Sequence, residues 1–358
     1  MPVATTPPAV NPEKLNAFLG KVVGDFGAAL SSTLVYIGQV LGLYKAMADS
    51  QPITPEELAR RTKTHVRYVR EWLINQAAGG YVEFDPASGH YHLSPEQVAA
   101  LTDEDSPAFV GGGFYVIKAM GQAQARIIEA FRTGGGLLWK DNDPDLFIGT
   151  ERFFRPGYKA HLVAEWIPAL EGVDAAMRQG TAVADVGCGH GASTILMAHA
   201  FPKCRFYGFD NHEPSIQHAQ KAAAAAGVGD RITFMVSEAG KIPNHQYGLV
   251  AFFDCLHDMG DPEGALRRAR ETLAPGGKVM LVEPMAGERV EENFNPIGRI
   301  FSAASTLCCT ANSMALKGLA LGTVVSDFSL RELARDAGLG HFRRATQTPF
   351  NRIFELKA

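Results

Sequence analysis

The chain has 358 residues, of which 46% are hydrophobic and 20% are charged, and its formal net charge at pH 7 is −4. This balance is typical of a globular protein, and the length predicts two or three domains. The small negative charge argues against a nucleic-acid partner, because phosphate binding requires a basic surface.

Targeting signals are missing from the sequence. No unbroken apolar run reaches the about 18 residues of a membrane span. The start, MPVATTPPAVNP, lacks the basic and apolar regions of a secretory signal and predicts a short disordered arm. Five cysteines without C-x-x-C spacing predict free thiols and no zinc site. We therefore expect a cytoplasmic protein with no membrane segment and no metal.

Residues 1–105 are predicted to form a mostly helical domain. Apolar side chains recur at helical spacing from residue 13 to residue 50. Thr54 and Glu57 have the spacing of a capping box that opens a second helix, and a third helix ends at Gly79-Gly80. Short strands at 81–84 and 90–93 flank a turn. This order predicts a winged helix.

A winged helix binds DNA in some proteins and mediates dimerisation or covers a substrate in others. The third helix region carries Lys63, Arg67 and Arg70, but Glu71 follows and the surroundings are not broadly basic. The sequence therefore favours dimerisation. Residues 106–180 then read as a helical linker and lid, interrupted by glycines at 111–114 and 134–136, with Phe154 and Tyr158 as candidates to close over a ligand.

From residue 181 apolar strands alternate with helices, which predicts a doubly wound α/β sheet with parallel strands. Strands are expected at 181–187, 204–210, 231–239, 247–254 and 277–284. Ser329 and Glu332 have capping-box spacing at the last helix, and two strands joined at Thr348-Pro349 end the chain. Residues 286–325 interrupt the alternation and are expected to form a helical insert over the carboxyl edge of the sheet, where ligands bind in such folds.

The stretch VADVGCGHGAST places glycines at 187, 189 and 191 behind Asp185, and two ligands are consistent with it. A dinucleotide loop has the pattern G-x-G-x-x-G/A, which Gly187 to Ala192 satisfies. A methyl-donor loop has an acidic residue two positions before alternating glycines. Asp210 ends the next strand and suits ribose hydroxyls in either case. Asp185 would repel a pyrophosphate but suits an ammonium group, which favours the methyl donor.

Four motifs carry a family resemblance: VADVGCGHG, GFD, FFDCLHDMGDP and LAPGGK. Residues 181–358 resemble a class I S-adenosylmethionine-dependent methyltransferase, whose fold is Rossmann-like and seven-stranded. With the winged helix in front, the chain is similar to small-molecule O-methyltransferases of plants and bacteria, and closer still to a winged-helix group known from mycobacteria. The resemblance implies S-adenosylmethionine as cofactor, S-adenosylhomocysteine as product and a homodimer.

The same resemblance implies a set of cofactor-binding residues. Those beneath or beside the methionine part are Asp185, Gly187, Cys188, Gly189, Phe253 and Asp254, with Tyr158 as a lid. Asp210 is expected on the ribose hydroxyls, and the adenine is expected beside Asn211, Glu238 and Ala239.

The catalytic residues follow from the segment HDM at 257–259, which resembles the HDW of the O-methyltransferases. There the histidine is the general base, and a pKa near neutrality suits this task. Glu283 and Asp327 match the two carboxylates that orient the ring, while Met259 replaces the usual tryptophan. The insert is expected to form the acceptor wall, with Asn295, Arg299 and Ser302 from the insert and Phe154 from the linker as candidate substrate contacts.

We therefore expect methyl transfer to a hydroxyl of a small, fairly apolar acceptor. Transfer to sulfur or nitrogen by proximity alone is the first alternative. A winged-helix transcription regulator that senses S-adenosylmethionine is an alternative of another class, and an NAD-dependent oxidoreductase is a third.

Overall fold

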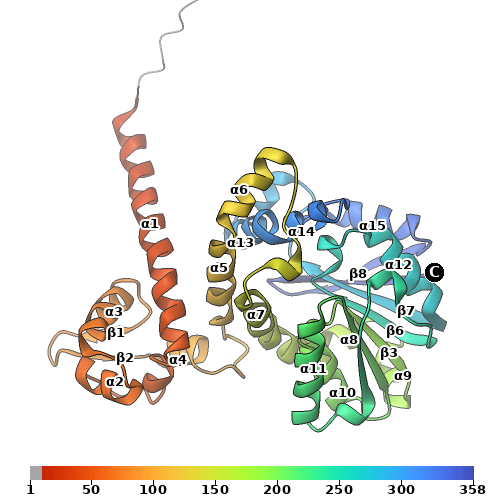
Figure 1. Cartoon of the computed structure of the whole chain (residues 1–358), viewed down its shortest axis with the longest axis horizontal. Helices are drawn as coiled ribbons and strands as arrows, with labels where there is room; N and C mark the ends of the chain where they lie inside the picture. Colours follow the sequence, from red (N-terminus) through yellow and green to blue (C-terminus); the bar gives the residue numbers. More distant parts are fainter. Residues whose placement is uncertain (1–9) are drawn as a thin grey trace, which may run out of the picture. The chain divides into compact units, whose positions relative to one another are not determined.

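The computed structural model describes residues 10–358, so most of the predicted disordered arm lies outside the described residues. The chain divides into two compact units, one ending at Phe114 and the other running from Tyr115 to Ala358 (Figure 1). We predicted a first domain that ends at residue 105 and a separate linker at 106–180. The structure instead assigns most of that linker to the second unit.

The first unit has the predicted winged-helix order. Its elements are α1 (Pro12–Val40), η1 (Lys45–Met47), α2 (Pro55–Thr62), α3 (Val66–Ala78), β1 (Glu83–Asp85), β2 (His90–His92) and α4 (Pro95–Leu101). Half of the predicted capping box forms at α2. The Thr54 hydroxyl accepts a hydrogen bond from the Glu57 backbone N–H at 3.2 Å, but the Glu57 carboxylate binds Arg60 and Arg61.

Helix α1 exposes many apolar side chains. The exposed ones in its first two thirds are Leu15, Phe18, Leu19, Val23, Phe26 and Leu30. By length and composition, α1 is the one helix within residues 10–358 that could cross a membrane, and only 6% of its most apolar window is buried. The sequence did not predict a membrane-crossing helix here, because glycine, serine and threonine residues interrupt the apolar residues of α1.

The second unit contains a seven-stranded sheet within the described chain, as predicted, in the order β5-β4-β3-β6-β7-β9-β8 (Figure 1). The strands are β3 (Ala182–Val186), β4 (Arg205–Asp210), β5 (Ile232–Val236), β6 (Tyr247–Phe253), β7 (Leu273–Pro284), β8 (His341–Gln347) and β9 (Asn351–Lys357). The first five are parallel, whereas β9 pairs antiparallel with both β7 and β8. Successive strands are added on one side of β3 up to β5 and on its other side from β6 onward. In such sheets ligands bind at the carboxyl ends of the strands at this switch point, here β3 and β6.

Helices cover both faces of this sheet. The second unit has α5 (Gly112–Gln122, shared with the first unit), α6 (Gln124–Thr133), η2 (Trp139–Asp141), α7 (Asp145–His161), η3 (Leu162–Trp166), α8 (Ile167–Ala169), α9 (Val173–Gln179), α10 (Ala192–Ala200), α11 (Glu213–Ala225), η4 (Gly229–Arg231), η5 (Ala239–Lys241), η6 (Leu256–Asp258), α12 (Pro262–Thr272) and α15 (Asp327–Asp336). Helices α8 to α11 pack on one face through residues such as Met197 and Ile216. Helices α12 and α15 pack on the other through Leu266 and Leu330.

Two helix starts are set by local signals near a predicted boundary. The Gly-rich stretch GGGF at 111–114 falls between α4 and α5, and α5 begins within it at Gly112. Helix α15 begins at Asp327, and its cap is Ser326, whose hydroxyl accepts from the Ser329 backbone N–H at 3.1 Å. The predicted box at Ser329 and Glu332 lies one turn too late, because the cap is Ser326, which has no Glu or Gln three residues later and so lacks the capping-box spacing.

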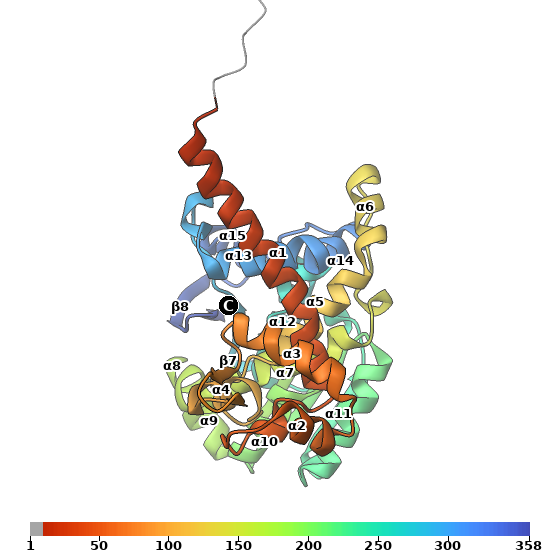
Figure 2. The same cartoon turned by 90° about the vertical axis from the view of Figure 1, so that its left-hand side faces the viewer.

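The predicted insert is helical. It contains η7 (Val290–Asn293), α13 (Pro296–Ala304), the π-helical turn η8 (Ser305–Cys309) and α14 (Thr310–Ala315). It lies beside α5 and α6, as Figures 1 and 2 show, and Met120 and Cys308 share one apolar cluster there. The Leu137 backbone N–H donates to the Ala311 carbonyl at 3.0 Å. These contacts hold the insert over the carboxyl edge of the sheet.

Candidate active site

The glycine loop after β3 opens the site. Gly187, Gly189 and Gly191 all have positive φ, at 74°, 51° and 82°. A Cβ at Gly187 would meet the Cys255 sulfur at 2.7 Å, and one at Gly191 would meet the Phe234 ring at 2.8 Å. A Cβ at Gly189 would meet nothing within 4 Å. Two of the glycines therefore allow packing against neighbouring elements, while Gly189 borders open space that a ligand can enter.

Three carboxylates end the strands around this loop. Asp185, at β3, is fully buried; one of its oxygens accepts from the Ser193 and Thr194 hydroxyls at 2.6 Å, and the other has no partner. Asp210, at the end of β4, accepts from the Gly189 backbone N–H at 2.9 Å. The third carboxylate, Asp254, directly follows β6. The predicted residues Asp185, Gly189 and Asp210 therefore lie together.

Asp254 follows β6 in a left-handed conformation with φ of 52°. Its carboxylate accepts from the Tyr158 hydroxyl at 3.0 Å and from the Asn351 side-chain amide at 2.6 Å. The Tyr158 ring also packs on Phe253, with centroids 5.3 Å apart, and on Phe154 at 6.0 Å. The predicted lid residue is thus anchored to the predicted donor-binding strand end. Sequence reasoning missed Asn351, because it reaches Asp254 only through the pairing of β9 with β7, the strand beside β6.

Burial makes these acids unusually weak. It raises the pKa of Asp185 to about 6 and that of Asp254 to about 8, in the second case with the charge of Glu283 adding to the effect. Burial likewise raises the pKa of Asp210 and brings that of Asp258 to about 7. Carboxyls shift in this way when they are desolvated without a positive partner. A cationic ligand would supply that partner, whereas a pyrophosphate would be repelled.

His257 and Glu283 form a buried pair. The imidazole Nδ1 donates to the Glu283 carboxylate at 2.5 Å, and the two side chains are 3% and 0% exposed. Burial alone would lower the pKa of His257, but the adjacent negative charge of Glu283 outweighs it and raises this pKa well above the ordinary value. The carboxylate fixes the imidazole orientation and stabilises its protonated form, as general base catalysis requires.

Asp327 does not join this pair, contrary to the prediction. Its carboxylate accepts from Arg352 at 2.7 Å and from Arg344 at 2.6 Å. Because α15 begins at Asp327, this side chain faces β8 and β9, which carry the two arginines. Arg352 stands opposite Glu283 in the sheet register, so Arg352 links Asp327 to the strand position of Glu283.

The insert contacts the histidine through residues that the sequence did not single out. Cys309, in η8, lies close enough to His257 for each side chain to shift the pKa of the other. Asn312 donates to the Asp258 carbonyl and Ser313 to the Met259 carbonyl, each at 2.9 Å. No local sequence pattern marks Cys309 as a neighbour of His257. These three contacts clamp the insert onto the HDM segment.

The predicted acceptor contacts within the insert lie at its surface. The Asn295 side chain caps α13 by accepting from the Gly298 backbone N–H at 2.9 Å, and the Ser302 hydroxyl donates to the Arg299 carbonyl. All three of Asn295, Arg299 and Ser302 are exposed. The structure gives the first of them a capping role and brings none of them to His257.

The predicted adenine residues are also near the solvent. Asn211 and Glu238 are exposed, and the Glu238 carboxylate pairs with Lys241 at 2.9 Å. Ala239 is half-buried. The Ser237 backbone N–H donates to the Asp210 carbonyl at 2.9 Å, so the ends of β4 and β5 stay adjacent. Asn211 and Glu238 therefore flank Asp210 at one strand edge.

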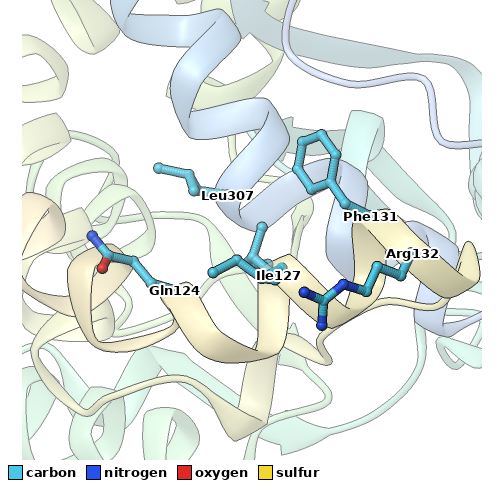
Figure 3. Close-up of a pocket in the computed structure, with 6 residues that line it drawn as sticks. Gln124, Ile127, Phe131, Arg132 and Leu307 are labelled. Atoms are coloured by element: carbon cyan, nitrogen blue, oxygen red, sulfur yellow. The ribbon is translucent and has the colours of Figure 1, made fainter.

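An apolar pocket of about 380 Å³ lies between α6 and η8. Figure 3 shows Ile127, Phe131 and Leu307 around it. Leu307 and Cys309 are two residues apart in one helical turn and therefore point in different directions. None of the residues that line this pocket is a predicted site residue.

Comparisons with known proteins agree with this geometry. A methyltransferase domain model matches residues 177–334, and an Rv2258c-like winged HTH domain model matches residues 28–103. The 27-O-demethylrifamycin SV methyltransferase of Amycolatopsis mediterranei is 32% identical over 107 residues, which are 29% of this chain. The match spans 39% of that relative's length.

Solved structures show the same fold over nearly the whole chain. Mitomycin 7-O-methyltransferase has a TM-score of 0.69 at 19% identity, and the match covers 97% of this chain and 100% of the other. Human N-acetylserotonin methyltransferase, solved in complex with S-adenosylmethionine, has a TM-score of 0.69 at 16% identity, covering 100% and 99%. The glycine loop, the acidic strand ends and the two matched models lead to one assignment: this chain joins an Rv2258c-like winged helix-turn-helix domain to a methyltransferase domain.

Proposed function

We propose that the protein transfers a methyl group from S-adenosylmethionine to a hydroxyl oxygen of a small, fairly apolar acceptor. The observation that carries this proposal is the acidic strand edge beside Gly189. Asp185, Asp210 and Asp254 are buried there, and burial raises the pKa of each. S-adenosylmethionine carries an ammonium group and a sulfonium, which complement this edge.

The residues around the loop divide the binding task. Gly189 leaves room for a close approach, and the unpartnered oxygen of Asp185 is a free acceptor for an ammonium group. Asp210 suits ribose hydroxyls, and Tyr158 with Phe253 provides an apolar wall. When bound, S-adenosylmethionine supplies a reactive methyl group, so the protein has to align the acceptor and exclude water.

His257 is the proposed general base. An acceptor hydroxyl would lose its proton to the imidazole while its oxygen bonds to the methyl carbon and the carbon–sulfur bond of S-adenosylmethionine breaks, leaving S-adenosylhomocysteine. Glu283 would stabilise the resulting imidazolium. A thiolate or a neutral amine needs less help from a base, so the buried His257–Glu283 pair favours a hydroxyl. If His257→Ala kept near-normal turnover, transfer by proximity alone to sulfur or nitrogen would replace this proposal.

Calorimetric titration with S-adenosylhomocysteine tests the cofactor, with NAD as the parallel control. We expect binding of the first and none of the second. Binding of NAD alone would mean that the loop is a dinucleotide motif and that the proposal is wrong. A matched variant, Asp185→Asn, should weaken binding without changing the shape of this buried residue.

The winged helix supports a role in dimerisation rather than DNA binding. Arg67 is paired with Glu71, and Arg70 is paired with Glu56. These carboxylates neutralise the basic side chains that a DNA backbone would require. We propose a homodimer in which α1 contributes exposed apolar surface. A gel shift at low salt that detected DNA binding would instead support a regulator that senses S-adenosylmethionine.

We also propose that the protein acts in the cytoplasm. All five cysteines are free thiols in the described residues, which suits a reducing compartment. Fractionation of cells that produce the full chain tests this, and recovery of the protein in a membrane or secreted fraction would contradict it.

A further inference from the structure

Three side chains outside the proposed catalytic pair gather beside the glycine loop. Glu151 comes from α7, His190 from the loop itself and His218 from α11. His190 Nδ1 lies 2.9 Å from a Glu151 carboxylate oxygen, and His218 Nε2 lies 3.6 Å from the same oxygen. One oxygen therefore faces a ring nitrogen of each histidine.

The three groups are close enough to share one ion. One ligand atom from each residue lies within 4.8 Å of the other two. The side chains of His190 and Glu151 are 8% and 21% exposed, whereas that of His218 is 50% exposed. The two rings stack with centroids 4.0 Å apart, so the His218 ring has to turn before both nitrogens reach one ion. Its exposure leaves that rotation free.

Their chemistry selects the class of ion. Two neutral imidazole nitrogens and one carboxylate oxygen suit zinc and related transition metals, whereas magnesium and calcium prefer oxygen ligands. We propose that Glu151, His190 and His218 form a binding site for a divalent transition-metal ion of the zinc class. The sequence argument against zinc considered cysteine spacing alone, and this set contains no cysteine.

Nearby charges affect how strongly the site would bind a metal ion. The positive charge of Arg155, one turn along α7 from Glu151, would weaken metal binding, whereas the negative charge of Asp210 near His190 would strengthen it. Glu151 supplies the negative charge nearest to the proposed ion. An ion held there would join α7, the glycine loop and α11, three segments that are far apart in the sequence.

Zinc titration of the full chain tests this proposal directly and needs no methyl donor, so its failure would leave the proposed function unaffected. The metal-free protein is titrated with Zn²⁺ by calorimetry, and Mg²⁺ serves as the negative control. We expect one equivalent of Zn²⁺ to bind and the melting temperature to rise. His218→Asn and Glu151→Gln should each weaken Zn²⁺ binding by about tenfold or more.

A matched control separates this site from the other histidines. His245 is exposed and stacks on Tyr207, outside the cluster, so His245→Asn should bind Zn²⁺ like the native chain. Co²⁺ provides a second readout, because its visible absorption reports nitrogen and oxygen ligands and should be lost in His218→Asn. Equal Zn²⁺ binding by the native chain and both cluster variants, or no binding by the native chain, would overturn the proposal. So would a loss in Glu151→Gln alone.

Discussion

The His257–Glu283 pair shows how burial and charge compete at a single residue. Removing water from an imidazole disfavours its charged form, yet a carboxylate at 2.5 Å reverses the outcome. An imidazole with a raised pKa binds a proton strongly, but it can act as a base only in its neutral form. Because Glu283 raises the pKa of His257, the pH at which the rate falls depends on Glu283.

Glu283→Gln should shift that pH dependence. Without the carboxylate charge, burial lowers the pKa of His257, so the acid limb of kcat/KM moves to lower pH. The plateau should fall on the order of 10²-fold, because the imidazolium formed on proton transfer loses its partner. Steady-state rates across pH measure both effects.

Asp327→Asn is the informative comparison, since both carboxylates match the orienting pair of the resembled family. Asp327 pairs with Arg344 and Arg352, so its variant should lower the melting temperature and leave the acid limb in place. An equal shift of the limb in both variants would contradict the separate roles assigned here.

Asp254 gives a second residue-level prediction. Burial and the charge of Glu283 raise its pKa to about 8, so this carboxyl is largely protonated at neutral pH. An ammonium group bound beside it should lower that pKa and release a proton. Calorimetry with S-adenosylhomocysteine in buffers of different ionisation enthalpy should therefore show net proton release just below pH 8, and Asp254→Asn should release less.

Asparagine is a suitable replacement at this position because it tolerates positive φ. Proton release that is the same in the native chain and in Asp254→Asn would assign the effect to Asp185 or Asp258 instead. Binding with no dependence on the buffer would contradict the view that the acidic edge takes a cation.

At the scale of elements, the glycine loop separates folding from ligand binding. Gly189 and Gly191 both have positive φ, so alanine strains the backbone at either position. Only at Gly191 does the added Cβ also meet a packed side chain, the Phe234 ring at 2.8 Å. We expect Gly191→Ala to lower the melting temperature more than Gly189→Ala.

Gly189→Ala should weaken ligand binding more than Gly191→Ala does, although it costs less stability. Gly189→Ala places its methyl group in the open space and should weaken S-adenosylhomocysteine binding in a protein that still folds. Thermal unfolding and calorimetry on the same samples check both statements. A Gly189→Ala protein with native affinity would show that the ligand does not approach this part of the backbone.

Local sequence patterns predicted most elements of the second unit and fewer of its contacts. Apolar strands bounded by glycines and helices identify the doubly wound sheet, and the final hairpin at Thr348-Pro349 forms as expected. The start of α15 was not predictable locally, because Ser329 has the capping-box spacing with Glu332 and yet Ser326, which lacks it, caps the helix. Because α15 begins at Asp327, the Asp327 side chain pairs with Arg344 and Arg352.

The missed contacts have a common cause. Cys309 reaches His257 only because Asn312 and Ser313 bind the HDM segment, and Asn351 reaches Asp254 only through the pairing of β7 with β9. Each contact depends on elements that are distant in the sequence. Residue spacing predicts neighbours within one element and does not predict which side chains a helical insert turns inward.

At the scale of the whole molecule, α1 stands out because one side of it is apolar and exposed. Leu15, Leu19, Val23, Phe26 and Leu30 follow helical spacing and are all exposed. A contiguous apolar surface of this kind marks an interface with protein or membrane. Lys21 and Asp25 form an ion pair elsewhere on the same helix, which makes α1 amphipathic.

A charge placed in the apolar stripe should therefore separate the copies of a homodimer. We expect the native chain to be dimeric in light scattering, and Phe26→Glu with Leu30→Glu to be monomeric without a change in the fold of the second unit. Lys21→Glu is the matched control, since it adds negative charge to the polar side and should leave the dimer intact. A native chain that is monomeric in solution but sediments with lipid vesicles would contradict the homodimer and identify α1 as a membrane-binding helix.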